Sequence, residues 1–114
     1  MSLINEDAID RLRKFGGDKL LGGMIELFAA NAPRLSAEAR EALDCGDAAA
    51  LRAALHSLKS SAGQLGAGSV YEACVVGEGL ASRGELDACA AQVVRIEADL
   101  PGVCSELDSL RVTS

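Results

Sequence analysis

The chain has 114 residues, 49% of them apolar and 3% aromatic, and it carries a formal net charge of −6. This length suffices for one domain with a single core and no disulfide or metal staples, so we assign residues 1–114 to one domain. The acidic charge argues against nucleic acid or an anionic membrane as the main partner. No apolar run approaches the roughly 20 residues that cross a bilayer. Alanine and leucine, in place of aromatic residues, favour helices over sheets.

The cysteines are widely spaced and include no C-x-x-C pair. They are Cys45, Cys74, Cys89 and Cys104. Because the chain has one histidine, they form no zinc-like cluster. The first residues lack a basic region followed by an apolar stretch, which is the pattern of a signal peptide. We therefore expect a cytoplasmic protein whose cysteines are reduced, small residues of the core.

A short helix is predicted at the start of the chain. Asn5 is a residue type that caps helix N-termini. The helical period then puts Ile9, Leu12 and Phe15 on one apolar face. The pair Gly16-Gly17 is expected to end this helix.

The following helix concentrates large apolar side chains. They are Leu20, Leu21, Met24, Leu27 and Phe28. We expect most of them in the core and one or two exposed, where a partner can dock on them. Pro33 loses a hydrogen bond inside a helix, so it either starts a new helix or kinks this one. The helical period then continues to Asp44.

The middle of the chain predicts two further helices. Cys45-Gly46-Asp47 reads as a helix stop followed by a cap, and a helix then runs from about 48 to 67. Gly68 is expected to close it. Residues 69–72 have the S-x-x-E form of a capping box, which predicts a helix from about 70 to 82.

Gly77 and Gly79 lie inside this third long helix. Glycine weakens a helix interior, so the segment is expected to be either locally soft or closely packed against a neighbour.

The last predicted helix follows Gly84. Apolar residues at steps of three and four run from Leu86 to Leu110, and Pro101 is expected to kink or split this helix. Short loops between consecutive amphipathic helices favour antiparallel neighbours. The sequence therefore predicts an all-α fold, an up-down antiparallel four-helix bundle with an additional short N-terminal helix or helices.

The only histidine, His56, lies on the predicted helix that begins near residue 48. The buried stripe of that helix reads Leu51, Leu55, Leu58, Ala62 and Leu65. The neighbouring stripe reads Arg52, His56, Lys59, Ser60 and Gly63. Small residues around the imidazole leave it accessible to another molecule.

The sequence excludes several common kinds of active site. The chain has no glycine-rich nucleotide motif and no recognised nucleophile signature, and one histidine is too few for a di-iron site. Imidazole side chains titrate near pH 6.5, so much of the population is an unprotonated nucleophile at neutral pH. The Lys59 ammonium, one turn away, can neutralise the oxygens of a phosphoryl group on the ring. These residues therefore suit phosphoryl transfer, which needs positioning and charge compensation.

Residues 56–67, His-Ser-Leu-Lys-Ser-Ser-Ala-Gly-Gln-Leu-Gly-Ala, resemble the H-x-L-K-G-S-[SA]-x-x-[LI]-G-A signature of histidine-containing phosphotransfer (HPt) domains. The resemblance extends upstream to Gly16 and downstream through Cys74–Glu78, and it covers about residues 5–110. The chain departs from the family pattern at Ser60, where glycine is usual, and at Gly77, where leucine is usual.

The resemblance implies roles for the residues around the histidine. His56 would accept a phosphoryl group from a receiver-domain aspartate and pass it to another, and Lys59 would contact the phosphate. Glu78 is expected to accept a hydrogen bond from the ring Nδ1 and leave Nε2 free to react. Partner docking and packing around the site are assigned to Arg52, Ser60, Ser61, Gly63 and Gly66. Ser60 and Ser61 are alternatively ordinary helix serines that bond back to the preceding turn.

The expected function is that of a phosphocarrier, not an enzyme, that relays phosphoryl groups between receiver domains in a two-component phosphorelay. The expected partners are response-regulator receiver domains or a hybrid sensor histidine kinase. The chain is expected to be a monomer that binds no cofactor of its own, with Mg²⁺ supplied by the receiver. The alternative is an interaction module that binds and sequesters a receiver or kinase without being phosphorylated. A domain of a longer sensor kinase would have the same chemistry.

Overall fold

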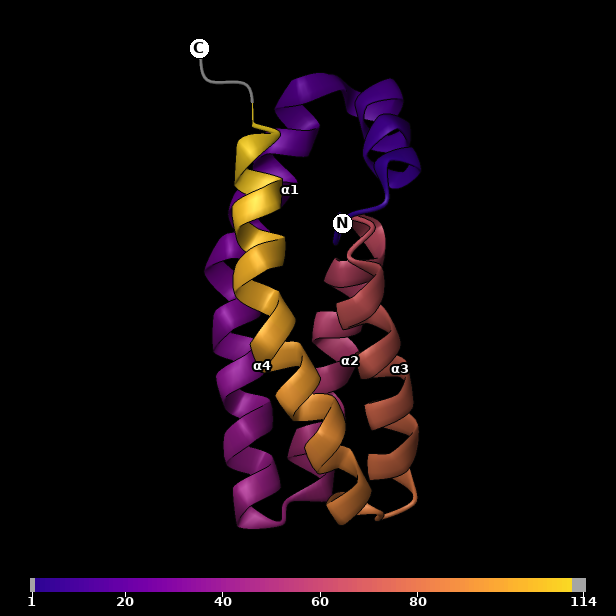
Figure 1. The fold of residues 1–114 in the computed structure, drawn as a ribbon, viewed down its shortest axis with the longest axis vertical. Helices are drawn as coiled ribbons and strands as arrows, with labels where there is room; N and C mark the ends of the chain where they lie inside the picture. The colour runs from indigo at the N-terminus through magenta and orange to yellow at the C-terminus, as the bar shows by residue number, and fades with distance from the viewer. Residues whose placement is uncertain (1, 112–114) are drawn as a thin grey trace.

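The computed structural model describes residues 2–111 and contains α1 (Glu6–Cys45), α2 (Ala48–Gln64), α3 (Gly68–Ser82) and α4 (Leu86–Ser109). The helices form an elongated bundle measuring 45 × 24 × 21 Å (Figure 1). They pack in a ring, with α1 on α2, α2 on α3, α3 on α4 and α4 on α1. Because short connections make consecutive helices antiparallel, the predicted up-down helical bundle is confirmed.

α1 is interrupted at Gly17, whose φ of 73° and ψ of −170° lie outside the helical region. Glycine adopts a positive φ without the strain that a Cβ would add. The segment before this kink is the additional N-terminal helix, and it lies at one end of the bundle (Figure 1). Asn5 caps it, since its side-chain oxygen accepts a hydrogen bond from the Asp7 N–H at 2.9 Å.

The predicted apolar face of the N-terminal segment is only partly correct. Ile9 is buried and Leu12 is half-buried, but Phe15 is 88% exposed. The assignment of Phe15 was wrong because the turn that precedes the kink lies at the outer end of the molecule (Figure 1).

Both prolines lie inside helices that continue through them. α1 runs through Pro33, and α4 runs through Pro101 without being split. Each proline removes one backbone hydrogen bond, but neighbouring residues Ala32 and Leu100 are buried in the core. Packing of these neighbours in the core therefore keeps each helix continuous through its proline.

α2 ends at Gln64, three residues earlier than predicted. Gly66, not Gly68, is the left-handed residue that closes it, with a φ of 70°. The N–H groups of Gly66 and Ala67 donate to carbonyls of the last turn of α2, which is how a left-handed glycine ends a helix.

α3 consequently begins at Gly68, with Ala67 in the cap position. The predicted capping box was wrong, because Ser69 lies inside the first turn of the helix. The Ser69 hydroxyl donates to the Asp99 carboxylate and thereby joins α3 to α4.

The core runs the length of the bundle and is built mostly from leucine, isoleucine, valine and alanine. Among the large apolar residues that follow the kink, Leu21 and Phe28 are buried and Leu27 is 64% exposed. The four cysteines are free; Cys74 and Cys89 are buried, and Cys104 is half-buried. Cys45 is exposed at the end of α1, so its assignment to the core was wrong.

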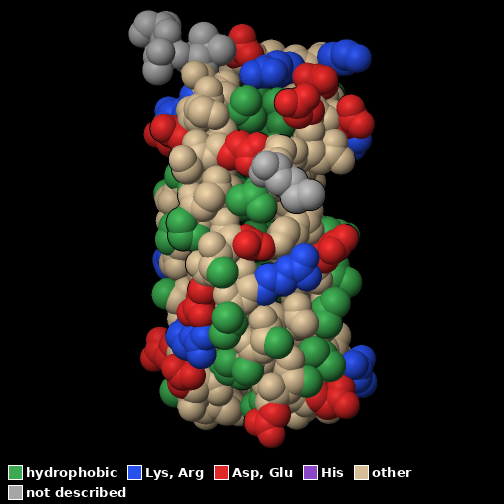
Figure 2. Space-filling view, viewed as in Figure 1, with side chains coloured by type: hydrophobic (Ala, Val, Ile, Leu, Met, Phe, Trp, Pro, Cys, Tyr) green, Lys and Arg blue, Asp and Glu red, His purple; other side chains and the backbone are tan. Residues whose placement is uncertain are grey.

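The surface carries charges of both signs. Figure 2 shows acidic and basic side chains interspersed with apolar ones along the face on which α4 lies in front. Within residues 2–111, no helix is both long enough and apolar enough to cross a membrane.

Candidate functional site

α2 presents His56 at the surface because its opposite face is anchored in the core. The Asp47 carboxylate caps the helix by accepting a hydrogen bond from the Ala50 N–H at 3.0 Å. Leu55 is 0% exposed and Leu58 is 1% exposed. With the rotation of the helix fixed in this way, the His56 side chain remains 62% exposed.

The imidazole ring forms a cluster with two other polar side chains, one from α2 and one from α3. His56 Nδ1 lies 2.8 Å from Glu78 Oε1, and Lys59 Nζ lies 2.7 Å from Glu78 Oε2. The Glu78 side chain is 18% exposed and that of Lys59 is 27% exposed. One carboxylate therefore joins the imidazole and the ammonium.

The charge state of Glu78 follows from these contacts. The hydrogen bond from Lys59 lowers the pKa of Glu78, the hydrogen bond with His56 lowers it further, and partial burial opposes both. The carboxylate is thus ionised at neutral pH and can only accept hydrogen bonds. Of the two neutral tautomers of the imidazole, the carboxylate favours the one that carries its proton on Nδ1 and a lone pair on Nε2. Such a ring is an exposed nitrogen nucleophile.

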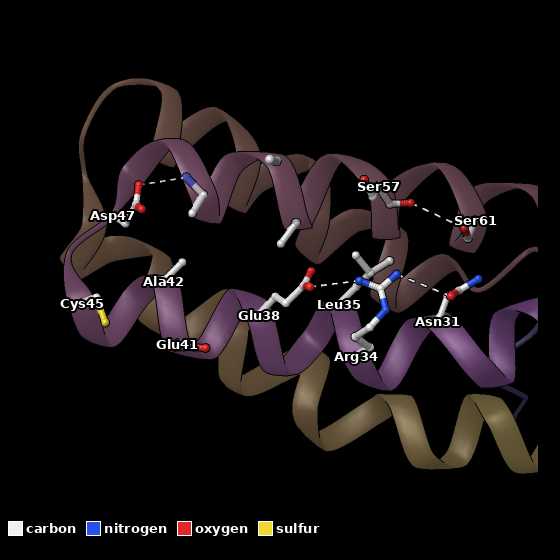
Figure 3. Close-up of a pocket in the computed structure, with 13 residues that line it drawn as sticks. Asn31, Arg34, Leu35, Glu38, Glu41, Ala42, Cys45, Asp47, Ser57 and Ser61 are labelled. Atoms are coloured by element: carbon white, nitrogen blue, oxygen red, sulfur yellow. Dashed lines mark hydrogen bonds and ion pairs between the residues drawn. The ribbon is translucent and has the colours of Figure 1, made fainter.

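The two serines after the histidine bond back to their own helix. Ser60 Oγ donates to the His56 carbonyl at 3.3 Å, and Ser61 Oγ donates to the Ser57 carbonyl at 3.5 Å. Ser60 is exposed next to Lys59, in a groove that both residues line. Ser61 instead lines the cleft between α1 and α2 (Figure 3).

The predicted glycines make close packing contacts. A Cβ on Gly63 would lie 3.1 Å from Cδ1 of the Tyr71 ring on α3. A Cβ on Gly66 would lie 2.8 Å from the Asn5 carbonyl oxygen and 2.9 Å from Ala8 Cβ. Gly63 therefore serves the α2–α3 contact, and Gly66 serves the contact with the N-terminal segment.

The segment of the chain that carries His56 has no acidic residue, although the protein is acidic overall. The chain has 17 acidic residues, yet none lies between Asp47 and Glu72. Arg52 is exposed one turn before His56, and among residues 2–111 it joins no ion pair.

Exposed apolar side chains flank the exposed face of α2 on both neighbouring helices. Leu27 of α1 lines a small pocket with Ser61, and Tyr71 and Val75 of α3 are 41% and 43% exposed. Neither Tyr71 nor Val75 was predicted as a site residue. Val75 precedes Glu78 by three residues, a spacing that puts both on one face of a helix.

The Hpt domain family model matches residues 23–109. No curated protein and no solved structure gave a match. The matched residues include all of α2, α3 and α4 and the part of α1 that follows Gly22, and hence His56, Lys59 and Glu78. The chain therefore belongs to the Hpt domain family, as its resemblance predicted, and is a phosphotransfer module of two-component signalling, a phosphocarrier and not a catalytic domain.

Proposed function

We propose that His56 is the phosphoryl acceptor and donor of this chain, and that it relays phosphoryl groups between receiver-domain aspartates in a phosphorelay. The observation that carries the proposal is the exposed imidazole whose Nδ1 lies 2.8 Å from an ionised carboxylate, that of Glu78. This contact orients the ring and directs reaction to Nε2, as an outer partner of a reactive histidine does.

In the forward step, the Nε2 lone pair attacks the phosphorus of an aspartyl phosphate. The bond from phosphorus to the aspartate oxygen breaks, and the carboxylate leaves with the bonding pair. Nδ1 keeps its proton, so the phosphorylated ring becomes positively charged, and the Glu78 carboxylate stabilises that charge. The reverse step hands the phosphoryl group to a second aspartate and restores the neutral ring.

Lys59 would compensate the charge of the phosphoryl oxygens. Its ammonium lies one turn from His56 on the same face of α2, with 27% of the side chain exposed. Phosphoryl transfer depends mainly on positioning and on such charge compensation. We expect the receiver to bring the Mg²⁺ that supplies the remaining charge compensation. We expect no transfer without a receiver.

The docking surface would be the acid-free face of α2 with its apolar flanks. A receiver presents a reacting aspartate and binds a cation through acidic side chains, so Arg52 and Lys59 complement its charge. Leu27 and Tyr71 would provide apolar contacts on either side. Ser60 lies within this surface and would help to determine which receivers bind.

The relay would operate in the cytoplasm with a monomeric carrier, which releases each partner after transfer.

A chase experiment with two receivers tests the relay. A receiver labelled with ³²P on its aspartate is mixed with the chain, the labelled chain is purified, and a second receiver from a panel is added. Label that moves first to the chain and then to the second receiver supports the relay. A receiver that binds the chain without ever labelling it would identify the protein as an interaction module instead.

A further inference from the structure

We propose that Gly77 is a positioning residue of the phosphotransfer site. Without a side chain at this position, α3 approaches α2 closely enough for the Glu78 carboxylate to reach His56. The inference rests on the proposed roles of His56 and Glu78, and it concerns what holds the two side chains at 2.8 Å.

The contact beneath the polar pair is unusually close. A Cβ built on Gly77 would lie 2.9 Å from Leu55 Cδ1, a separation that real Cβ atoms essentially never show. Leu55 directly precedes His56, and Gly77 directly precedes Glu78. The contact between the two inner residues therefore sets the separation of α2 and α3 at the position where their outer neighbours meet.

The surroundings leave little room to relieve an added methyl group. Leu55 is 0% exposed, so its side chain is enclosed by the core. On the other side of Gly77, the same Cβ would lie 3.5 Å from Gln92 Cβ of α4, and Cys89 Sγ lies 3.5 Å from the Gly77 carbonyl oxygen. Any relief must come from a shift of α3 relative to α2 or from a rearranged Leu55.

α3 also contains a matched control. Gly79 lies two residues further along the same helix, where a Cβ would meet only the end of the Arg83 side chain, at 3.7 Å. Alanine at either position raises helix propensity by the same amount. Only Gly77→Ala also inserts a methyl group between the helices.

The experiment compares the native chain with Gly77→Ala, Gly79→Ala and the double variant Gly77→Ala/Leu55→Val. The double variant adds one carbon and removes one, so it restores the volume of the contact. The first readout is the pair of ¹⁵N shifts of the unphosphorylated His56 ring, which report which nitrogen carries the proton. The second is the rate of phosphoryl transfer from a labelled receiver.

We expect Gly77→Ala to lose the Nδ1-protonated signature and to slow transfer by about tenfold, as the loss of an outer partner does. Gly79→Ala should keep both native values, and Leu55→Val should restore both in the double variant. Native ring shifts in Gly77→Ala, or equal effects of the two alanines, would overturn the proposal.

Two further outcomes remain decisive. If Gly77→Ala does not fold, the folded double variant must show native ring shifts, and altered shifts would overturn the proposal. If the native chain accepts no phosphoryl group, the proposed function fails, but the ring shifts still test the positioning role by themselves.

Discussion

Lys59 Nζ lies 2.7 Å from Glu78 Oε2 in the unphosphorylated protein. The ammonium expected to meet the phosphate is therefore already paired with a carboxylate. If His56 carries the phosphoryl group as proposed, the phosphoryl oxygens have to share the Lys59 ammonium with the Glu78 carboxylate.

Replacing Glu78 removes the group that orients the imidazole. Glu78→Ala should slow phosphoryl transfer by about 10- to 100-fold, because Nδ1 loses its acceptor. Glu78→Gln keeps an oxygen that can accept a hydrogen bond from Nδ1, so its transfer rate should fall less. Rates from one labelled receiver measure the effect, and the thermal midpoint of each variant serves as the folding control. A native rate in Glu78→Ala would remove Glu78 from the mechanism.

Replacing Lys59 should raise the pKa of Glu78. The hydrogen bond from Lys59 is the largest of the effects that lower this pKa, so Lys59→Met should bring it back toward the ordinary value of about 4.5. The ¹³C shift of the Glu78 carboxyl group, followed against pH, measures the change. A titration unchanged in Lys59→Met would contradict the contact.

The same pKa shift makes stability depend on pH. Because the pKa of Glu78 is lower in the folded state than in the unfolded state, its contribution to stability is fully present above about pH 4.5. It is lost as the pH falls through the folded-state pKa. The stability difference between the native chain and Glu78→Gln should therefore shrink as the pH falls below about 4.5. A difference that persists unchanged in strong acid would contradict this sign.

Gly66 and Gly84 offer a matched test of the N-terminal contact. Both have a left-handed φ, of 70° and 74°, but only a Cβ on Gly66 would collide with another segment, at Asn5 and Ala8. Gly84→Ala should cost about 1 kcal/mol from backbone strain. Gly66→Ala should cost about 1–3 kcal/mol more from overpacking. Urea denaturation measures both, and equal losses would show that the N-terminal segment does not depend on Gly66.

Leu27 tests the docking surface on α1. It is 64% exposed, whereas Val94 is 55% exposed on α4, across the bundle from α2. Leu27→Ser should weaken receiver binding by about tenfold, and Val94→Ser should leave it unchanged. Titration calorimetry with the receiver that transfers fastest distinguishes them. If only Val94→Ser weakens binding, receivers dock on another face.

Much of the fold and the exposed position of His56 were predictable from local pattern. The three- and four-residue spacing of Leu51, Leu55 and Leu58 predicts both a helix and its buried face, and His56 follows on the neighbouring stripe. The expected contact of Glu78 with His56 came from resemblance to a family, and the 2.8 Å distance agrees with it.

Features set by tertiary contacts were not predictable. In the sequence, Gly77 indicates either a soft point of the helix or a close packing contact, and only the position of Leu55 on the neighbouring helix shows that it is a close contact. Ser69 has the pattern of a cap, but its hydroxyl binds Asp99, thirty residues away in sequence. Phe15 follows the helical period and is still exposed, because the spacing of apolar residues does not indicate where the bundle ends.

The most direct test of the central claim is to locate the phosphoryl group. The native chain and His56→Gln are incubated with the same phosphorylated receiver, and the products are examined by ³¹P NMR and by stability of the label in acid and base. We predict an acid-labile, base-stable phosphoryl group on Nε2 of His56 in the native chain and no label on His56→Gln. Equal labelling of the two proteins would contradict the assignment of His56 as the phosphoryl carrier.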